Sequence, residues 1–102
     1  MLMTDMPKNV SEIIEQIVDI CVKKADVDEL ILYGSRAKGT HMQRSDIDIA
    51  IKGRHIDIDM LHDALHAVDT LLKIELVDIE NCKNELLKKE VEKDGIVLYS
   101  KA

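Results

Sequence analysis

The sequence predicts an α/β domain in which a small mixed β-sheet of about four strands packs with helices. Apolar residues spaced three and four apart, as in helices, alternate along the chain with short continuous or alternating apolar runs, as in strands. A chain of 102 residues is long enough for one compact domain and too short for two. We therefore expect a single domain over residues 1–102.

The first half of the chain predicts a helix followed by a strand. Apolar residues recur at helical spacing over 11–25, and we expect Asn9 or Ser11 to cap this helix. Residues 30–33, LILY, form an apolar run that stops at Gly34, which indicates a buried strand entering a tight turn.

A loop, GSRAKGTHMQRS, separates this strand from the next. Over 46–52, isoleucines alternate strictly with other residues, which predicts a half-buried strand. The second half then predicts a helix over 57–72, a strand over 73–79, a helix over 81–94 and a closing strand over 96–99.

The charge balance argues against nucleic acid as a direct partner. Twenty acidic and 14 basic residues give a net charge of −6, so no general basic field exists to hold a phosphate backbone. Aromatic residues make up 2% of the chain, which leaves almost nothing to stack on bases. Any anionic ligand must therefore be a small molecule held by local groups, or a protein with a basic patch.

The chain reads as cytoplasmic. Its N-terminus, MLMTDMPKNV, lacks the pattern of a secretion signal, and no apolar stretch approaches the length of a membrane span. Cys21 and Cys82 lie far apart without metal-ligand spacing, which favours free thiols in a reducing compartment.

The strongest chemical signal is a Gly34–Ser35 pair at the end of one strand, followed after ten residues by Asp46 and Asp48 on the next. Residues two apart on a strand point the same way, so the two carboxylates share one face. Mg²⁺ resolves the repulsion of such a pair, since it binds through one or two carboxylates together with phosphate oxygens. The alternative is an exposed loop followed by an edge strand with solvated aspartates.

The turn before the acids suits phosphate. Gly34 permits positive φ and close backbone approach, so N–H groups can converge on an anion, and Ser35 adds a hydroxyl donor. Arg36, Lys38 and Arg44 place a cationic cluster in the same loop. A polyphosphate in this turn, bridged by Mg²⁺ to the paired acids, is the arrangement that metal-assisted phosphoryl-group transfer requires.

The stretch GSRAKGTHMQRSDIDIAI resembles the signature of the DNA polymerase beta type nucleotidyltransferases: GS, ten residues, then DxD. The element order, KIELVDIE and the closing DGIVLY extend the resemblance to the minimal nucleotidyltransferases over nearly the whole chain. The resemblance implies that Gly34 and Ser35 hold the β and γ phosphates of a nucleoside triphosphate, that Lys38 touches phosphate, and that Asp46 and Asp48 bind Mg²⁺.

The same resemblance implies a third acid on a later strand, which binds metal and orients or deprotonates the attacking hydroxyl. Glu75 and Asp78 compete for this role, and only one can join the site, because residues three apart on a regular strand face opposite ways. Alternation alone leaves the choice open. The third acid of the family usually follows an apolar residue early in the strand, which favours Glu75, although the family more often has an aspartate there.

The resemblance further implies an enzyme that transfers AMP from ATP to a hydroxyl acceptor, with two Mg²⁺ ions and release of pyrophosphate. Minimal nucleotidyltransferases pair with a helical HEPN protein, an RNase toxin, and act as antitoxins by adenylylating a tyrosine in a hetero-oligomer. The short chain leaves no second domain to hold an acceptor, so a partner polypeptide should supply the hydroxyl. The alternatives are a binding module that neutralises the partner by contact, and an enzyme acting on a small molecule such as an aminoglycoside.

Two further patterns are weak. His62 and His66 are four apart on the predicted helix and could share a metal, but Asp63 stands where a zinc protease needs Glu, so a polar helix face is the better interpretation. The stretch from Gly34 to Thr40 imitates a P-loop but lacks the lysine before the threonine, which rejects a Walker ATPase.

Overall fold

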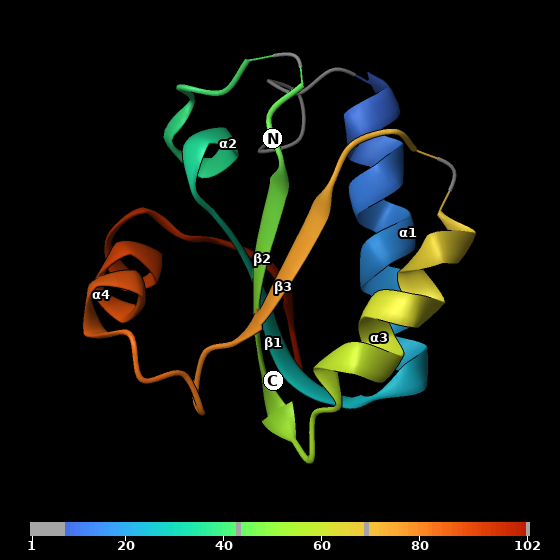
Figure 1. Ribbon diagram of the computed structural model, residues 1–102, viewed down its shortest axis with the longest axis vertical. Coiled ribbons are helices and arrows are strands. Elements are labelled where there is room, and N and C mark those ends of the chain that lie inside the picture. The colour runs from blue at the N-terminus through green and yellow to red at the C-terminus, as the bar shows by residue number, and fades with distance from the viewer. Residues whose placement is uncertain (1–7, 43, 69, 102) are drawn as a thin grey trace.

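The computed structural model describes residues 8–42, 44–68 and 70–101 (Figure 1). Helices and strands alternate along the chain as the apolar patterns predict. In chain order the elements are α1 Lys8–Lys24, β1 Asp26–Tyr33, α2 Ser35–Lys38, β2 Ile47–Arg54, α3 Ile58–Ala64, the 3₁₀ turn η2 Leu65–Ala67, β3 Ile74–Asp78, α4 Glu85–Asp94 and β4 Ile96–Ser100.

The four strands form one mixed sheet in the order β3-β2-β1-β4. The central strand β1 pairs antiparallel with β2 and with β4, whereas β2 pairs parallel with β3. Figure 1 shows α1 and α3 together on one face of the sheet and α4 on the other. The predicted fold class, a small mixed sheet packed with helices, is therefore confirmed.

The larger core fills the space between the sheet and α1 with α3. Aliphatic side chains build it, since the alternate residues Ile47, Ile49 and Ile51 of β2 are fully buried there against Ile14 and Ile17 of α1. A smaller cluster lies under α4 and comprises Ile31, Ala50, Ile79 and Val91. The period of two in β2 thus sends its isoleucines to the larger core and leaves the other face of the strand for other side chains.

Helix boundaries differ from the prediction in three places. Asn9 and Ser11 lie inside α1, so neither is its N-cap, and that prediction was wrong. The helix expected over 57–72 ends at Ala64 and continues as a single 3₁₀ turn. The helix expected from residue 81 begins at Glu85, because the side chain of Asn84 accepts a hydrogen bond of 3.1 Å from the Leu87 N–H and caps it.

Both cysteines are free thiols, as predicted. Cys21 is buried beneath the sheet, and this burial raises the pKa of its thiol to about 11. The thiol therefore stays protonated at neutral pH and behaves as a small apolar core residue. Within the described residues, no helix is both long and apolar enough to cross a membrane.

Candidate active site

The acidic residues gather on the α4 face of the sheet, near the ends of the strands where α2 packs. The register of the strands sets this arrangement: Tyr33 of β1 lies opposite Asp48 of β2, and Asp48 lies beside Glu75 of β3. Directly paired residues on neighbouring strands point to the same face. Three adjacent strands therefore present a tyrosine, an aspartate and a glutamate in one row.

The charges around Asp48 reinforce one another. Partial burial, and then repulsion from Asp46, Glu75 and Glu90, raises the pKa of the Asp48 carboxyl above its usual value. Asp46 itself is exposed just before β2. Since several carboxylates act on one another here, this end of the sheet favours a cation.

Gly34 lies directly against this carboxylate. The residue has a φ of 78°, the positive value that the sequence predicts for the turn. A Cβ atom at Gly34 would lie 2.5 Å from Oδ2 of Asp48, closer than a side chain can approach. The positive φ of the turn therefore favours glycine, and a Cβ added there would push the Asp48 carboxylate aside.

The loop after Gly34 is not structureless, as it contains the one-turn helix α2. Arg36 is buried, and its Nε and Nη2 donate hydrogen bonds of 3.1 and 2.9 Å to the Ser45 carbonyl, which joins the start of the loop to its end. The Arg36 side chain therefore stabilises the loop instead of binding a ligand. Lys38 reaches across to α4, where its Nζ lies 3.2 Å from Oε1 of Glu90, and Arg44 is exposed.

The two candidates for the third acid lie on different faces. Glu75 is in register with Asp48, and its Oε1 lies 2.7 Å from Nζ of Lys73. Asp78 is in register with the core residue Ile51 at the other end of β3, and its Oδ2 accepts a hydrogen bond of 2.7 Å from the Asn81 side chain. The structure therefore brings Glu75, and not Asp78, beside the paired acids.

Three residues around the acids were not predicted from the sequence to lie at the site. Tyr33, Lys73 and Glu90 all interact electrostatically with Asp48. Burial, together with the nearby acids, raises the pKa of the Tyr33 phenol to about 12, so it remains a neutral hydroxyl at physiological pH. The position of Tyr33 follows from the antiparallel register, which no local pattern reveals, and Glu90 belongs to a charged helical run that the sequence cannot orient.

The donor set suits Mg²⁺. Carboxylate oxygens are the ligands that this hard cation prefers, and the missing Cβ of Gly34 leaves one of them open beside a backbone turn. Among the residues that the structure describes, however, no three His, Cys, Asp or Glu side chains form a ready metal-binding group. Asp48 and Glu75 are therefore paired across neighbouring strands, and the Glu75 carboxylate forms an ion pair with Lys73.

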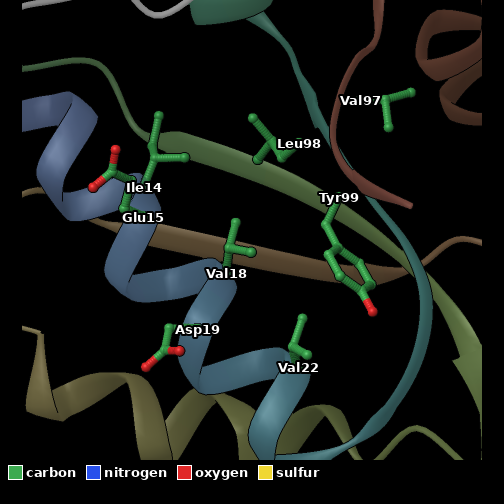
Figure 2. A pocket seen from close by; sticks show the side chains of 8 residues that line it. All are labelled: Ile14, Glu15, Val18, Asp19, Val22, Val97, Leu98 and Tyr99. Carbon is green, nitrogen blue, oxygen red and sulfur yellow. The ribbon is translucent and has the colours of Figure 1, made fainter. Parts of the chain in front are cut away.

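The structure also contains two other hollows. An apolar groove of about 450 Å³ runs between α1 and β4 on the opposite side of the sheet, and Figure 2 shows Val18 and Val22 of α1 facing Leu98 and Tyr99 of β4 across it. A second hollow of about 310 Å³ is lined in part by His62 and His66, whose rings lie edge to face. Neither contains the predicted site residues.

Comparison with known proteins agrees with this fold. The model of the family described as Polymerase beta, Nucleotidyltransferase matches residues 15–102. A protein of Methanocaldococcus jannaschii, named "Putative protein adenylyltransferase MJ1379", is 28% identical over 92 residues, which cover 85% of this chain and 92% of that protein.

Solved structures of similar fold include toxin–antitoxin complexes. A chain of a toxin–antitoxin crystal structure with AMP-PNP is 26% identical, with a TM-score of 0.72, and the match covers 85% of this chain and 73% of that one. A complex of a tri-AMPylated HEPN toxin of Shewanella oneidensis with its MNT antitoxin matches in fold at 22% identity, with a TM-score of 0.68 and coverage of 88% and 71%. With the family model matching from residue 15 to residue 102, the chain belongs to the polymerase beta nucleotidyltransferase family.

Proposed function

We propose that this protein is an antitoxin that transfers AMP from ATP to a tyrosine hydroxyl of a partner HEPN toxin, in a reaction that depends on Mg²⁺. The observation that carries the proposal is the contact between the glycine turn and the acids: Gly34 lies against Asp48, and Asp48 lies in register with Glu75. A phosphate-binding turn beside paired acids is what transfer of a nucleotidyl group requires.

Asp46, Asp48 and Glu75 are the residues that we assign to hold two Mg²⁺ ions. When bound, the metal neutralises phosphate charge and polarises the bond that is to be broken. Without metal the same carboxylates repel one another, and this repulsion adds to burial in raising the pKa of Asp48. The cost of this repulsion is consistent with a site built for binding rather than for stability.

The turn and the short helix after it would bind the triphosphate. The backbone N–H groups after Gly34 and the Ser35 hydroxyl would donate to the β and γ phosphates, which leave together as pyrophosphate. Lys38 would add a positive charge on the same side, exchanging Glu90 for a phosphate oxygen. The Arg36 bond to the Ser45 carbonyl holds the turn and the acid pair at a fixed separation.

The acceptor hydroxyl would come from the partner. We assign Glu75 to orient this hydroxyl or accept its proton, because it lies at the outer side of the row, on the edge strand β3. The toxin–antitoxin complex with AMP-PNP and the AMPylated HEPN toxin support ATP as the donor and a HEPN protein as the acceptor.

The test is transfer of label from [α-³²P]ATP to the cognate HEPN protein in the presence of Mg²⁺. We expect label on the partner with the wild type and none with Asp46→Ala plus Asp48→Ala. A matched control is Asp59→Ala plus Asp63→Ala, which removes two exposed acids from α3 and should leave transfer intact.

Three other results would contradict the proposal. If the wild type labels nothing yet still blocks the RNase, the protein neutralises its partner by contact alone. Label on an aminoglycoside only would make it an enzyme that acts on small molecules. Label on the partner at a residue other than tyrosine would leave the enzyme standing and overturn the acceptor.

A further inference from the structure

Lys73 places a positive charge at the exposed edge of the acidic site. Its Nζ lies 2.7 Å from Oε1 of Glu75, the closest ion pair among the described residues. Its backbone carbonyl accepts a hydrogen bond of 2.9 Å from the N–H of Ile47, the residue between the two metal-binding aspartates of the proposed function. The lysine is therefore anchored in position by its main chain.

The charge of Lys73 acts on all three acids. The Lys73 ammonium donates a hydrogen bond to Glu75, and Asp46 and Asp48 lie within electrostatic reach of it. An ammonium and a divalent cation at the same carboxylates exclude each other, since both need the same oxygens and repel one another.

The contacts of Glu75 agree with such competition between the ammonium and a metal ion. Although Glu75 is in register with Asp48, it does not join Asp46 and Asp48 in a ready metal-binding group in the described part of the chain. Its carboxylate is engaged by Lys73 instead. We propose that Lys73 competes with a divalent cation for Glu75 and so sets how tightly the acidic site binds metal, an inference that rests on the proposed function.

Mn²⁺ binding to the ATP-free protein, measured by isothermal titration calorimetry, tests the competition. Lys73→Met should tighten the binding of Mn²⁺ on the order of three- to tenfold, because one neighbouring positive charge is lost. Lys73→Arg retains the charge and should bind Mn²⁺ as the wild type does. Lys52→Met is the matched control, since Lys52 pairs with Glu29 at 3.6 Å and its loss changes the net charge equally.

A second pair of variants ties the effect to Glu75. In a Glu75→Gln background, Lys73→Met should give no gain, because the contested carboxylate is absent. An equal gain in both backgrounds would overturn the inference, as it would reflect general electrostatics. Unchanged or weaker Mn²⁺ binding by Lys73→Met would also overturn it, and would make Lys73 a support for Glu75.

Failure of the proposed function would look different. If neither the wild type nor Lys73→Met binds Mn²⁺, or if Asp46→Ala plus Asp48→Ala binds it as well as the wild type, the acids are not the metal site, and the inference falls with them. If the double aspartate variant loses binding while Lys73→Met changes nothing, the site stands and only the role of Lys73 is wrong.

Discussion

The two faces of β2 are built for opposite purposes from one seven-residue pattern. On the face toward α1 and α3, Ile47, Ile49 and Ile51 are fully buried in an aliphatic core. On the face toward α4, Asp48 is only partly covered, and burial followed by repulsion from the nearby acids raises its pKa. Because successive side chains of a strand point to opposite faces, adjacent residues of β2 can lie in an apolar core and in a charged site.

The comparison shows where stability and chemistry reside. The core face stabilises the fold through burial of apolar surface, at about 25 cal/mol per Å². The acid face lowers the stability of the unliganded protein, since like charges are held together. Substitutions on the two faces should therefore move stability and activity in different ways, and the following predictions test that separation.

The largest effect on stability should come from the core face. Ile49→Ala removes a fully buried side chain from the centre of the sheet and should lower the free energy of unfolding by about 2 to 5 kcal/mol. Urea denaturation measures this loss. At a temperature where the variant is still folded, its transfer activity should stay near that of the wild type, and a loss of activity without a loss of stability would break the separation.

The acid face should respond in the opposite way. Asp48→Asn should lower AMP transfer by at least about 100-fold, because a neutral amide is a poor ligand for Mg²⁺. It should also raise Tm at neutral pH, because it removes a carboxylate that the surrounding acids destabilise. A calorimetric scan beside the transfer assay measures both effects, and a fall in Tm would show that the charge of Asp48 is needed for folding.

The contact between the turn and the acid is testable with two glycines of the same conformation. Gly34 and Gly39 have φ of 78° and 79°, but a Cβ at Gly39 would meet nothing within 4 Å. Gly39→Ala should therefore cost only the backbone strain of about 1 kcal/mol. Gly34→Ala should cost a similar backbone strain, because the Asp48 carboxylate can rotate away from the added Cβ, but it should reduce transfer by displacing that carboxylate.

The assignment of Glu75 as the third acid predicts that two carboxylates of β3 contribute differently to AMP transfer. Glu75→Gln should lower transfer at least about tenfold, because Glu75 lies beside Asp48. Asp78→Asn should leave transfer near the wild-type rate, because its side chain lies on the other face and bonds with Asn81. Initial rates at saturating ATP compare the two, and the reverse ranking would assign the role to Asp78.

The smallest effect is the pH dependence of stability. A raised pKa means that the folded state holds the Asp48 proton to higher pH than the unfolded state does, whose value is 3.8. The free energy of unfolding should therefore fall as pH rises from about 3.8 to the folded pKa. The Tm advantage of Asp48→Asn should vanish near pH 3.8 and grow toward neutral pH, and an advantage independent of pH would contradict the electrostatic cause.

The sequence predicts β2 and its two faces well, because alternation is a direct signal of a strand with one buried side. The paired acids and the positive φ of Gly34 follow from the same local patterns. The choice of Glu75 needed the register of β3 against β2, which pairs Asp48 with Glu75 across the sheet. Register is a tertiary property, and so the sequence alone could only weigh Glu75 against Asp78.

Other features depend on contacts that no local pattern encodes. The helix α2 spans only Ser35–Lys38, too short for any periodicity to appear. The residues after Ala64 keep helical spacing in the sequence, yet the backbone changes to a 3₁₀ turn while Leu65 and Val68 remain buried. The spacing of buried apolar residues therefore does not determine whether the backbone forms an α-helix or a 3₁₀ turn.

The bond between the Arg36 guanidinium and the Ser45 carbonyl has a consequence for how this protein can change. Because Arg36 joins the start of the segment to Ser45 at its end, this bond constrains the distance from the turn to the acids. Met42, at the tip, is 77% exposed. A change of the exposed Met42 side chain should therefore leave the separation of the turn and the acids unaltered.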